Sequence, residues 1–264
     1  MLELRNITKI FNPGTVNEKV ALENLNLTLE DGDFVTVIGG NGAGKSTMLN
    51  AIAGVWKPDA GSIQIDGVDV TAMPEYKRAQ FLGRVFQDPM MGTAADMQLY
   101  ENLALAKRRG KRRGFAWHIR RGERAEYAAM LKTLDLGLES RMTTKVGLLS
   151  GGQRQALTLL MASLKRPKLL LLDEHTAALD PKTAAKVLEI TDRIVSENRM
   201  TTLMITHNMR DAIAHGNRLI MMHEGHIIVD VRGEEKKKLT VEQLLGLFTK
   251  ASGNEFANDR AILS

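Results

Sequence analysis

One stretch decides the fold, Gly39-Gly-Asn-Gly-Ala-Gly-Lys-Ser-Thr47, because it matches the phosphate-loop pattern G-x-x-x-x-G-K-[ST]. The apolar run Phe34–Ile38 precedes it, and the helix-like run Met48–Ala53, which Gly54 ends, follows it. This is the strand, loop and helix context in which the pattern binds a nucleotide. Glycines let backbone N–H groups gather around a phosphate, and a helix N-terminus attracts its negative charge. The stretch therefore predicts a nucleotide site.

The composition limits the class of protein. The chain has 264 residues, enough for one large domain or a core with a subdomain, and it contains no cysteine, which excludes disulfides and cysteine nucleophiles. Residues Met1–Phe11 lack the apolar core of a signal peptide, and no uncharged apolar run approaches the ~20 residues that span a bilayer. We expect a protein that is soluble by itself and can dock on a membrane protein.

Positive charge is concentrated in one segment. The net charge is +5, but Lys107–Arg124 has nine basic residues and one acidic residue, which gives +8 there and −3 over the rest of the chain. Such a distribution does not indicate chain-wide binding of nucleic acid, and we expect no nucleic-acid partner. The basic residues are Lys107, Arg108, Arg109, Lys111, Arg112, Arg113, Arg120, Arg121 and Arg124.

The hydrophobic pattern predicts an α/β core with two additions. Leu2–Ile7 and Val20–Leu29 alternate like half-buried strands, which indicates a small antiparallel sheet against the nucleotide core. Between about residues 90 and 166 the pattern is mostly helical, as in an inserted subdomain. Strands are expected at Ser62–Asp66, Leu82–Phe86, Lys168–Glu174, Thr201–Thr206, Arg218–His223 and His226–Val231, helices at Tyr100–Arg109, Trp117–Leu134, Gly151–Lys165, Pro181–Asn198, Asn208–His215 and Thr240–Lys250, and a solvated charge cluster at Glu234–Lys238.

Two carboxylates end the apolar strand Lys168-Leu-Leu-Leu-Leu-Asp-Glu174. A strand buried on both faces brings them to the carboxyl edge of the sheet, beside the phosphate loop. There Asp173 is placed to hold Mg²⁺ through water, and Glu174 to polarise an attacking water. On the loop itself, Lys45 is placed to reach the terminal phosphates, and the Ser46 hydroxyl to bind Mg²⁺.

A second motif, Leu149-Ser-Gly-Gly-Gln-Arg-Gln155, separates the families of phosphate-loop proteins. With it the chain resembles the ATP-binding-cassette ATPases, whose signature is LSGGQ. Ser150, Gly151 and Gly152 open a helix, and their N–H groups with the Ser150 hydroxyl form an anion site. In the family this site closes on the γ-phosphate held by the phosphate loop of a partner chain, so the resemblance implies a homodimer.

Other positions match the family in order over about residues 1–235. Gln87 matches the Q-loop, which in the family senses Mg²⁺ and the attacking water and contacts the membrane subunits. Ala178-Leu179-Asp180 matches the D-loop at the dimer interface, and His207 matches the switch histidine that contacts γ-phosphate. Phe11 resembles the aromatic residue that stacks on adenine, and the alternative for it is simple core packing.

The resemblance implies an α/β fold: a P-loop NTPase (RecA-like) core with an N-terminal antiparallel β-subdomain and an inserted α-helical subdomain. The ATPase domain would span residues 1–235, with the helical subdomain at about 90–166, and residues 236–264 would form a C-terminal helix and tail. ATP and Mg²⁺ are the implied cofactors. The expected catalytic residues are Lys45, Gln87, Glu174 and His207, the expected nucleotide-binding residues are Phe11, Gly39, Asn41, Gly42, Ala43, Gly44, Lys45, Ser46, Thr47, Ser150, Gly151, Gly152 and Gln153, and the expected Mg²⁺ ligands are Ser46, Gln87 and Asp173.

The chain departs from the family after the catalytic glutamate. The family commonly has Pro-Thr-Ser there, whereas this chain has His175-Thr176-Ala177. Either the substitution is simply tolerated, or His175 makes hydrolysis sensitive to pH. His223 and His226 flank a predicted hairpin turn without a third ligand, so no metal site is expected there.

The function implied is that of an ATP-hydrolysing subunit that powers transport through separate membrane permease subunits at the cytoplasmic face of the membrane, together with an extracytoplasmic solute-binding protein. The helical block and Leu99–Ala106 look most like cassettes of amino-acid uptake systems, of the branched-chain or tryptophan/tyrosine kind. The alternatives are an efflux or lipoprotein-release cassette, a soluble cassette that acts on nucleic acid or ribosomes, and a nucleotide-gated scaffold. The basic segment Lys107–Arg124 would either contact anionic head groups or an acidic loop of the membrane partner, or be a solvated surface.

Overall fold

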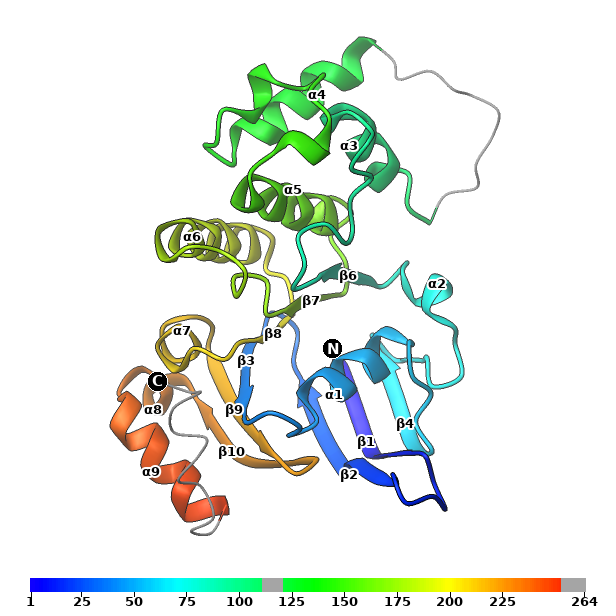
Figure 1. Cartoon of the computed structure of the whole chain (residues 1–264), viewed down its shortest axis with the longest axis vertical. Helices are drawn as coiled ribbons and strands as arrows, with labels where there is room; N and C mark the ends of the chain where they lie inside the picture. Colours follow the sequence, from blue (N-terminus) through cyan, green and yellow to red (C-terminus); the bar gives the residue numbers. More distant parts are fainter. Residues whose placement is uncertain (111–120, 253–264) are drawn as a thin grey trace.

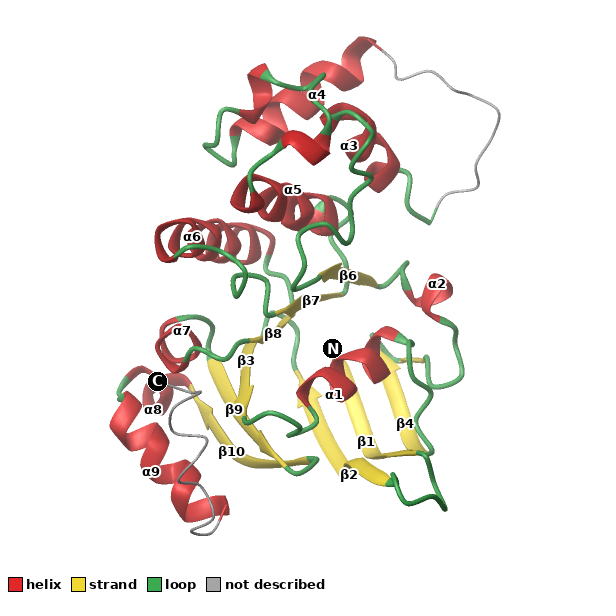
Figure 2. Cartoon of the chain, in the orientation of Figure 1, coloured by secondary structure: helices red, strands yellow, loops and turns green. Residues whose placement is uncertain are grey.

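Two β-sheets form the lower and middle parts of the molecule, and a group of helices forms the upper part (Figure 1). The computed structural model describes residues 1–110 and 121–252. Residues 111–120 of the basic segment and the tail from residue 253 onward lie outside the described residues, together with the predictions made for them. Figure 2 shows that the upper part contains helices and loops, while the strands belong to the two sheets below it.

The larger sheet has the order β10-β9-β3-β8-β7-β6. Neighbouring strands from β9 to β6 pair in parallel, and β10 is antiparallel at the edge. Because carboxyl ends of parallel strands meet at one edge of a sheet, the phosphate loop after β3, the carboxylates after β7 and the histidine after β8 converge as predicted. The strands are β3 (Phe34–Gly39), β6 (Leu82–Val85), β7 (Leu169–Asp173), β8 (Thr202–Ile205), β9 (Arg218–His223) and β10 (His226–Arg232).

The smaller sheet is antiparallel throughout, with the order β2-β1-β4-β5, and it confirms the predicted N-terminal β-subdomain. Its apolar face and that of the larger sheet bury one common core that includes Met48, Leu49 and Ile52 of helix α1. The helix of the phosphate loop therefore lies in the interior, between two sheets. The bounds are β1 (Leu2–Phe11), β2 (Lys19–Leu29), α1 (Lys45–Ala53), β4 (Ala60–Ile65), β5 (Val68–Asp69) and α2 (Glu75–Arg78).

The helical lobe, defined here as α3 to α5 with their connections, is inserted between β6 and β7, which are neighbours in the sheet. Its apolar residues, among them Leu103, Tyr127 and Leu157, share a second core with α6 and the upper face of the larger sheet. The predicted helices are thus present where they are described. Their bounds are α3 (Leu99–Lys107), α4 (Arg121–Lys132), the 3₁₀ turns η1 (Leu138–Ser140) and η2 (Val146–Leu148), α5 (Gly151–Ser163) and α6 (Pro181–Asn198).

The C-terminal part corrects one prediction. The sequence predicts a solvated charge cluster at residues 234–238. Four of these residues are exposed as expected, but Lys236, in helix α8 (Gly233–Lys237), is buried. The Lys236 ammonium donates to the carbonyl oxygens of His215, just after α7 (Met209–Ala214), and of Gly216. Burial lowers the pKa of Lys236 to about 8. Helix α9 (Val241–Ser252) packs its apolar residues on α7 and β9, and none of the helices described in residues 1–110 and 121–252 is both long and apolar enough to cross a membrane.

Helix α1 is capped at its buried end by a side chain from α2. Arg78 is 1% exposed, and its guanidinium donates to the carbonyl oxygens of Ala51 and Ile52 in the last turn of α1. It also donates to the carbonyl oxygens of Met73 and Thr71. A helix leaves its last carbonyls without partners, and a cation at this end also meets the negative end of the helix dipole.

Arg78→Met should therefore destabilise the fold by about 2–4 kcal/mol, because several buried carbonyls lose their donors while the volume is nearly kept. Urea unfolding measures this loss. Arg5→Met is the control, because Arg5 is exposed and its guanidinium bonds Glu3 on the same strand, so this change should leave the stability close to that of the unchanged chain. Equal stabilities of the two variants would contradict the capping role.

Candidate functional site

At two positions of the pattern, the backbone conformation and the close neighbours of the phosphate loop allow only glycine. Gly39 has φ +152°, and a Cβ there would lie 2.2 Å from the carbonyl oxygen of Met222. Gly44 has φ +98°, and a Cβ there would lie 2.6 Å from the carbonyl oxygen of Ala21. The loop is thus pressed against β9 and β2, and a side chain at either position would push it out of place.

Lys45 begins α1 and is 5% exposed. Its ammonium donates to the carbonyl oxygens of Gly39 at 2.7 Å and Gly40 at 2.9 Å, so it lies across the loop. A buried ammonium needs hydrogen-bond acceptors, and these two carbonyl oxygens supply them. The arrangement holds a positive charge at the N-terminus of a helix, where a phosphate group binds.

A cavity of about 280 Å³ lies beside this loop and brings several predicted residues together. Its lining extends from Phe11 on β1 to Glu174 and His207 at the edge of the larger sheet. The loop N–H groups and the buried lysine fit the phosphates of ATP, and the adjacent carboxylate can accept a proton from water. The lining residues are Phe11, Lys19, Ala21, Asn41, Gly42, Ala43, Gly44, Lys45, Ser46, Thr47, Glu174 and His207.

Glu174 and His207 form a close pair. The Glu174 Oε1 atom lies 2.5 Å from the Nε2 atom of His207. Glu174 has φ +47°, a left-handed conformation that is uncommon for a residue with a side chain, and it directly follows β7. The carboxylate and the imidazole thus lie close together at the edge of the sheet, beside the phosphate loop.

Asp173 ends β7 and lies beside a cation that the sequence did not single out. Arg84 Nη2 lies 3.4 Å from the Asp173 Oδ2 atom and donates to Asn50 Oδ1 of α1 at 2.8 Å. Burial raises the pKa of Asp173, and the Arg84 charge opposes this shift. Mg²⁺ prefers carboxylate, hydroxyl, phosphate and water oxygens, so Asp173 and Ser46 fit such an ion. The pairing of β6 with β7 is what would have singled out Arg84, because it places Arg84 next to Asp173.

Other predicted residues are not part of this cavity. Gln87 follows β6, is exposed and does not line it. Ser150 and Gly151 are exposed at the start of α5, in the helical lobe, and Figure 1 shows α5 well away from α1. The Ser150 hydroxyl accepts from the N–H of Gln153, and the Gln153 side chain accepts from the N–H of Ser150, which forms a capping box.

Gly152 has a packing role that the sequence did not reveal. A Cβ at Gly152 would lie 2.0 Å from the Cγ2 atom of Thr183, and one at Gly151 would lie 3.2 Å from a methyl group of Leu179. The signature helix α5 therefore rests closely on the segment 178–180 and on the first turn of α6. These glycines bring α5 close to α6 as well as leaving N–H groups open.

Phe11 borders the cavity and also packs against another ring. Its ring lies 5.4 Å from that of Trp56, at 84°. Lys19, which pairs with Phe11 across β1 and β2, was missed by the sequence analysis although it lines the cavity. Its Nζ atom would be 3.2 Å from a Cβ at Gly42 of the phosphate loop. The register between the two strands was the missing information.

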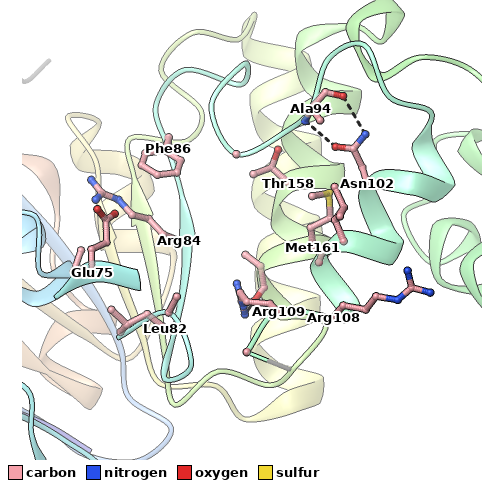
Figure 3. Close-up of a pocket in the computed structure, with 17 residues that line it drawn as sticks. Glu75, Leu82, Arg84, Phe86, Ala94, Asn102, Arg108, Arg109, Thr158 and Met161 are labelled. Carbon is pink, nitrogen blue, oxygen red and sulfur yellow. Dashed lines mark hydrogen bonds between the residues drawn. The ribbon is translucent and has the colours of Figure 1, made fainter. Parts of the chain in front are cut away.

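A second cavity, of about 470 Å³, lies between the helical lobe and the sheets (Figure 3). Figure 3 shows Glu75, Leu82, Arg84 and Phe86 on one side and side chains of α3 and α5 on the other. Asn102 is held by Ala94, whose N–H donates to the Asn102 side chain and whose carbonyl oxygen accepts from it. On the helical side the cavity is lined by Ala94, Asn102, Leu105, Ala106, Arg108, Arg109, Thr158, Met161 and Ala162.

The described part of the basic segment is largely paired. Lys107 forms an ion pair with Glu126, and Arg108 Nη2 lies 3.7 Å from Glu123. Arg109 donates to the carbonyl oxygen of Ala162, and burial lowers its pKa. The guanidinium of Arg124 lies 4.6 Å from the ring of Tyr100. These contacts tie the segment to the helical lobe, and the lipid-contact prediction for its remaining residues stays untested.

The described histidines outside the cavity have ordinary partners. His175 is 2% exposed, and burial lowers its pKa to about 4, so it is neutral near neutral pH and the structure gives no support for a pH switch there. His226 lies 3.3 Å from Glu23, across the turn from His223. Within residues 1–110 and 121–252 there is no group of three or more His, Asp or Glu side chains that could hold a metal ion.

Comparison with known proteins shows similarity to ABC transporter cassettes. The family model described as ABC transporter matches residues 22–177. The tyrosine transport ATP-binding protein of Clostridioides difficile (strain R20291) is 47% identical over 251 residues, which cover 95% of this chain and 100% of the relative. A dimeric ATP-binding cassette in a post-hydrolysis state bound to ADP and Pi has a TM-score of 0.74 and 30% identity, covering 88% of this chain and 98% of that one. The ADP conformation of an ABC transporter cassette has a TM-score of 0.76 and 27% identity, covering 94% and 98%.

Lys19→Met should weaken binding of ATP by about 2- to 5-fold, because an exposed cation near the phosphates contributes a modest attraction. Binding of adenosine, which has no phosphate, should not change. Titration calorimetry with both ligands measures the difference, and Lys57→Met, which alters an exposed lysine outside the cavity, is the control. An equal loss for ATP and adenosine would show that Lys19 does not act through the phosphates.

Proposed function

This chain belongs to the ABC transporter family and is an ATP-hydrolysing, ATP-binding subunit, and from this premise we propose that it powers the import of a small solute of the amino-acid kind. The observation that carries the ATPase part is the single cavity shared by the phosphate loop, Glu174 and His207, and the solute is proposed from the relative named for tyrosine transport. Phosphoryl transfer needs positioned groups rather than a covalent intermediate, and this cavity provides them.

We propose the following roles. Lys45 and the loop N–H groups bind the β- and γ-phosphates, while Ser46 and Asp173 hold Mg²⁺, which neutralises charge on the phosphates when it is bound. Glu174 accepts a proton from the attacking water, and His207 contacts the γ-phosphate. Gln87, although exposed, follows the strand that ends beside the Mg²⁺ carboxylate, which supports a role at the entrance of the site.

The active unit in this proposal is a homodimer with two composite sites. Ser150 and Gly151 are exposed and lie in the helical lobe, away from the phosphate loop of their own chain, so they are available to a second copy. The capping box orders this helix start before any ligand binds, which lowers the cost of binding a γ-phosphate. A dimeric cassette among the similar solved structures agrees with this arrangement.

The solute is proposed from the curated relative. The relative at 47% identity is named for tyrosine transport, so we propose an aromatic amino acid, delivered by an extracytoplasmic solute-binding protein to permease subunits, with this chain at the cytoplasmic face of the membrane. Co-purification from native membranes would identify the partners. A screen of amino acids against the partner binding protein would then test the solute, and failure of every amino acid to bind would refute this part.

We propose that the permease contacts the second cavity, which lies between the helical lobe and the sheets. Its walls carry an exposed Leu105 on α3 together with Ala106 and Met161, and the loop of Gln87 begins next to Phe86 at its border. An apolar cleft with a few charged groups at its rim suits a short helix of a partner. Because Arg84 both lines this cavity and contacts Asp173, the docking place is also close to the catalytic carboxylates.

Glu174→Gln should bind ATP within about 2-fold of the unchanged chain but hydrolyse it at least about 100-fold more slowly, because the amide cannot accept the proton. Nucleotide binding and phosphate release are measured on the same preparation. Glu189→Gln, a change of an exposed glutamate on α6, is the matched control. Near-normal turnover of Glu174→Gln would refute the assigned role.

Leu105→Glu should reduce assembly with the permease by about 10-fold or more, because a charge would be buried in the apolar cleft. The ATPase rate of the isolated subunit should not change. Leu247→Glu is the control, since Leu247 is a similarly exposed leucine on α9. Retention of the complex by Leu105→Glu in a pull-down would place the permease elsewhere.

A further inference from the structure

His175 is one of two residues, with Ala177, that depart from the family pattern, and its side chain forms a specific contact. The residue lies in the turn between β7 and α6, immediately after Glu174, and is 2% exposed. A polar ring that is buried so completely needs a hydrogen-bond partner to be tolerated. The partner is on α6, because the Nε2 atom of His175 lies 3.0 Å from the Oγ1 atom of Thr191.

The direction of this hydrogen bond follows from the neighbours. The Thr191 hydroxyl donates to the carbonyl oxygen of Val187, one turn earlier in α6, at 2.8 Å. A hydroxyl has only one proton, so toward His175 it is an acceptor. His175 therefore carries its proton on Nε2 and donates it to Thr191. Because the ring is neutral near neutral pH, one imidazole tautomer makes this contact.

The turn that His175 anchors is strained. Glu174 has φ +47°, and its N–H donates to the carbonyl oxygen of Ile205 at 3.0 Å while its own carbonyl oxygen accepts from the N–H of Ala177 at 3.0 Å. A left-handed conformation at a non-glycine residue persists only where the surroundings hold it. Two backbone hydrogen bonds hold the main chain of Glu174, and the next residue adds a side-chain tether to α6.

The hydrogen bond between His175 and Thr191 also concerns the position of the Glu174 carboxylate. Only 11% of the Glu174 side chain is exposed, and its Oε1 atom is 2.5 Å from His207. A small rotation of the backbone at residue 174 would swing the carboxylate away from both His207 and the phosphate loop. Misplacement of a catalytic group by about 1 Å can cost about 100-fold in rate.

We propose that the hydrogen bond from His175 to Thr191 fixes the strained turn that carries Glu174, which makes His175 a positioning residue for ATP hydrolysis. This inference rests on the proposed role of Glu174. It does not require His175 to touch ATP or to change its protonation state. It predicts that a donor at the position of Nε2, rather than an imidazole as such, is what hydrolysis needs.

The test uses the full chain, four single variants and one double variant, with Glu174→Gln measured in parallel. His175→Gln can keep an N–H donor within reach of Thr191, whereas His175→Leu removes it, and Thr191→Val removes the acceptor. Thr202→Val is the matched control, because Thr202 is also a buried threonine whose hydroxyl bonds a nearby backbone carbonyl, but at the opposite end of β8 from the site. For each variant, kcat, KM, the Kd for ATP and the melting temperature are measured.

We expect His175→Leu and Thr191→Val to lower kcat by about 10- to 100-fold, with KM and the Kd for ATP within about 2-fold, because binding uses the phosphate loop and not the turn. His175→Gln should recover most of kcat, and the double variant His175→Leu/Thr191→Val should be no slower than either single variant, since both remove one contact. Thr202→Val should keep kcat.

Three results would overturn the inference: an unchanged kcat in Thr191→Val, equal losses of kcat in His175→Gln and His175→Leu, or losses that simply add in the double variant. If His175→Leu does not fold, Thr191→Val and His175→Gln still decide the question. Glu174→Gln is measured in parallel. If it hydrolyses ATP normally the proposed function fails, whereas if it is inactive and Thr191→Val is normal, only the present inference fails.

Discussion

The rest of the structure depends on how the two ends of helix α1 are satisfied. The helix lies between two sheets, where water cannot complete its unpaired N–H and carbonyl groups. At the C-terminal end, Gly54 turns the chain back with φ +89°, and Arg78 donates to the last carbonyls. At the N-terminal end the groups face the cavity beside the phosphate loop. The C-terminal end of α1 is thus satisfied by protein groups, whereas its N-terminal end is open to a phosphate.

The parallel sheet turns this local arrangement into a site. Strands β3, β8 and β7 are adjacent, with Val35 beside Leu203 and Leu203 beside Leu171, so their carboxyl ends lie side by side. Residues that are far apart in the sequence, Lys45, Glu174 and His207, therefore line one cavity. The same sheet places Arg84 next to Asp173, because β6 is the neighbour of β7.

The sequence was sufficient where a residue type answers a local requirement. The phosphate loop, the buried leucine strand and the capped start of α5 follow from glycine freedom, hydrophobic runs and a serine cap, and the structure contains all three as expected. The sequence did not predict contacts between distant segments. Lys19 lines the cavity because of the register between β1 and β2. Lys236 lies in a charge-rich run that predicts a solvated side chain, but it is buried and donates to two carbonyl oxygens. Periodicity describes one segment at a time, whereas these side chains depend on what another segment places opposite them.

Helix α6 connects the parts of the site that a single chain keeps separate. In its first turn, Thr183 packs against Gly152 of the signature helix, and Leu179, just before α6, packs against Gly151. In the middle of α6, Thr191 accepts the hydrogen bond from His175. The signature helix and the turn of Glu174 therefore both contact one helix, which the buried Val187, Ile190 and Ile194 anchor in the core. A shift of this helix would move both together, since close packing resists independent sliding. Helix α6 is thus the element that contacts both the signature glycines and the turn that carries the carboxylate.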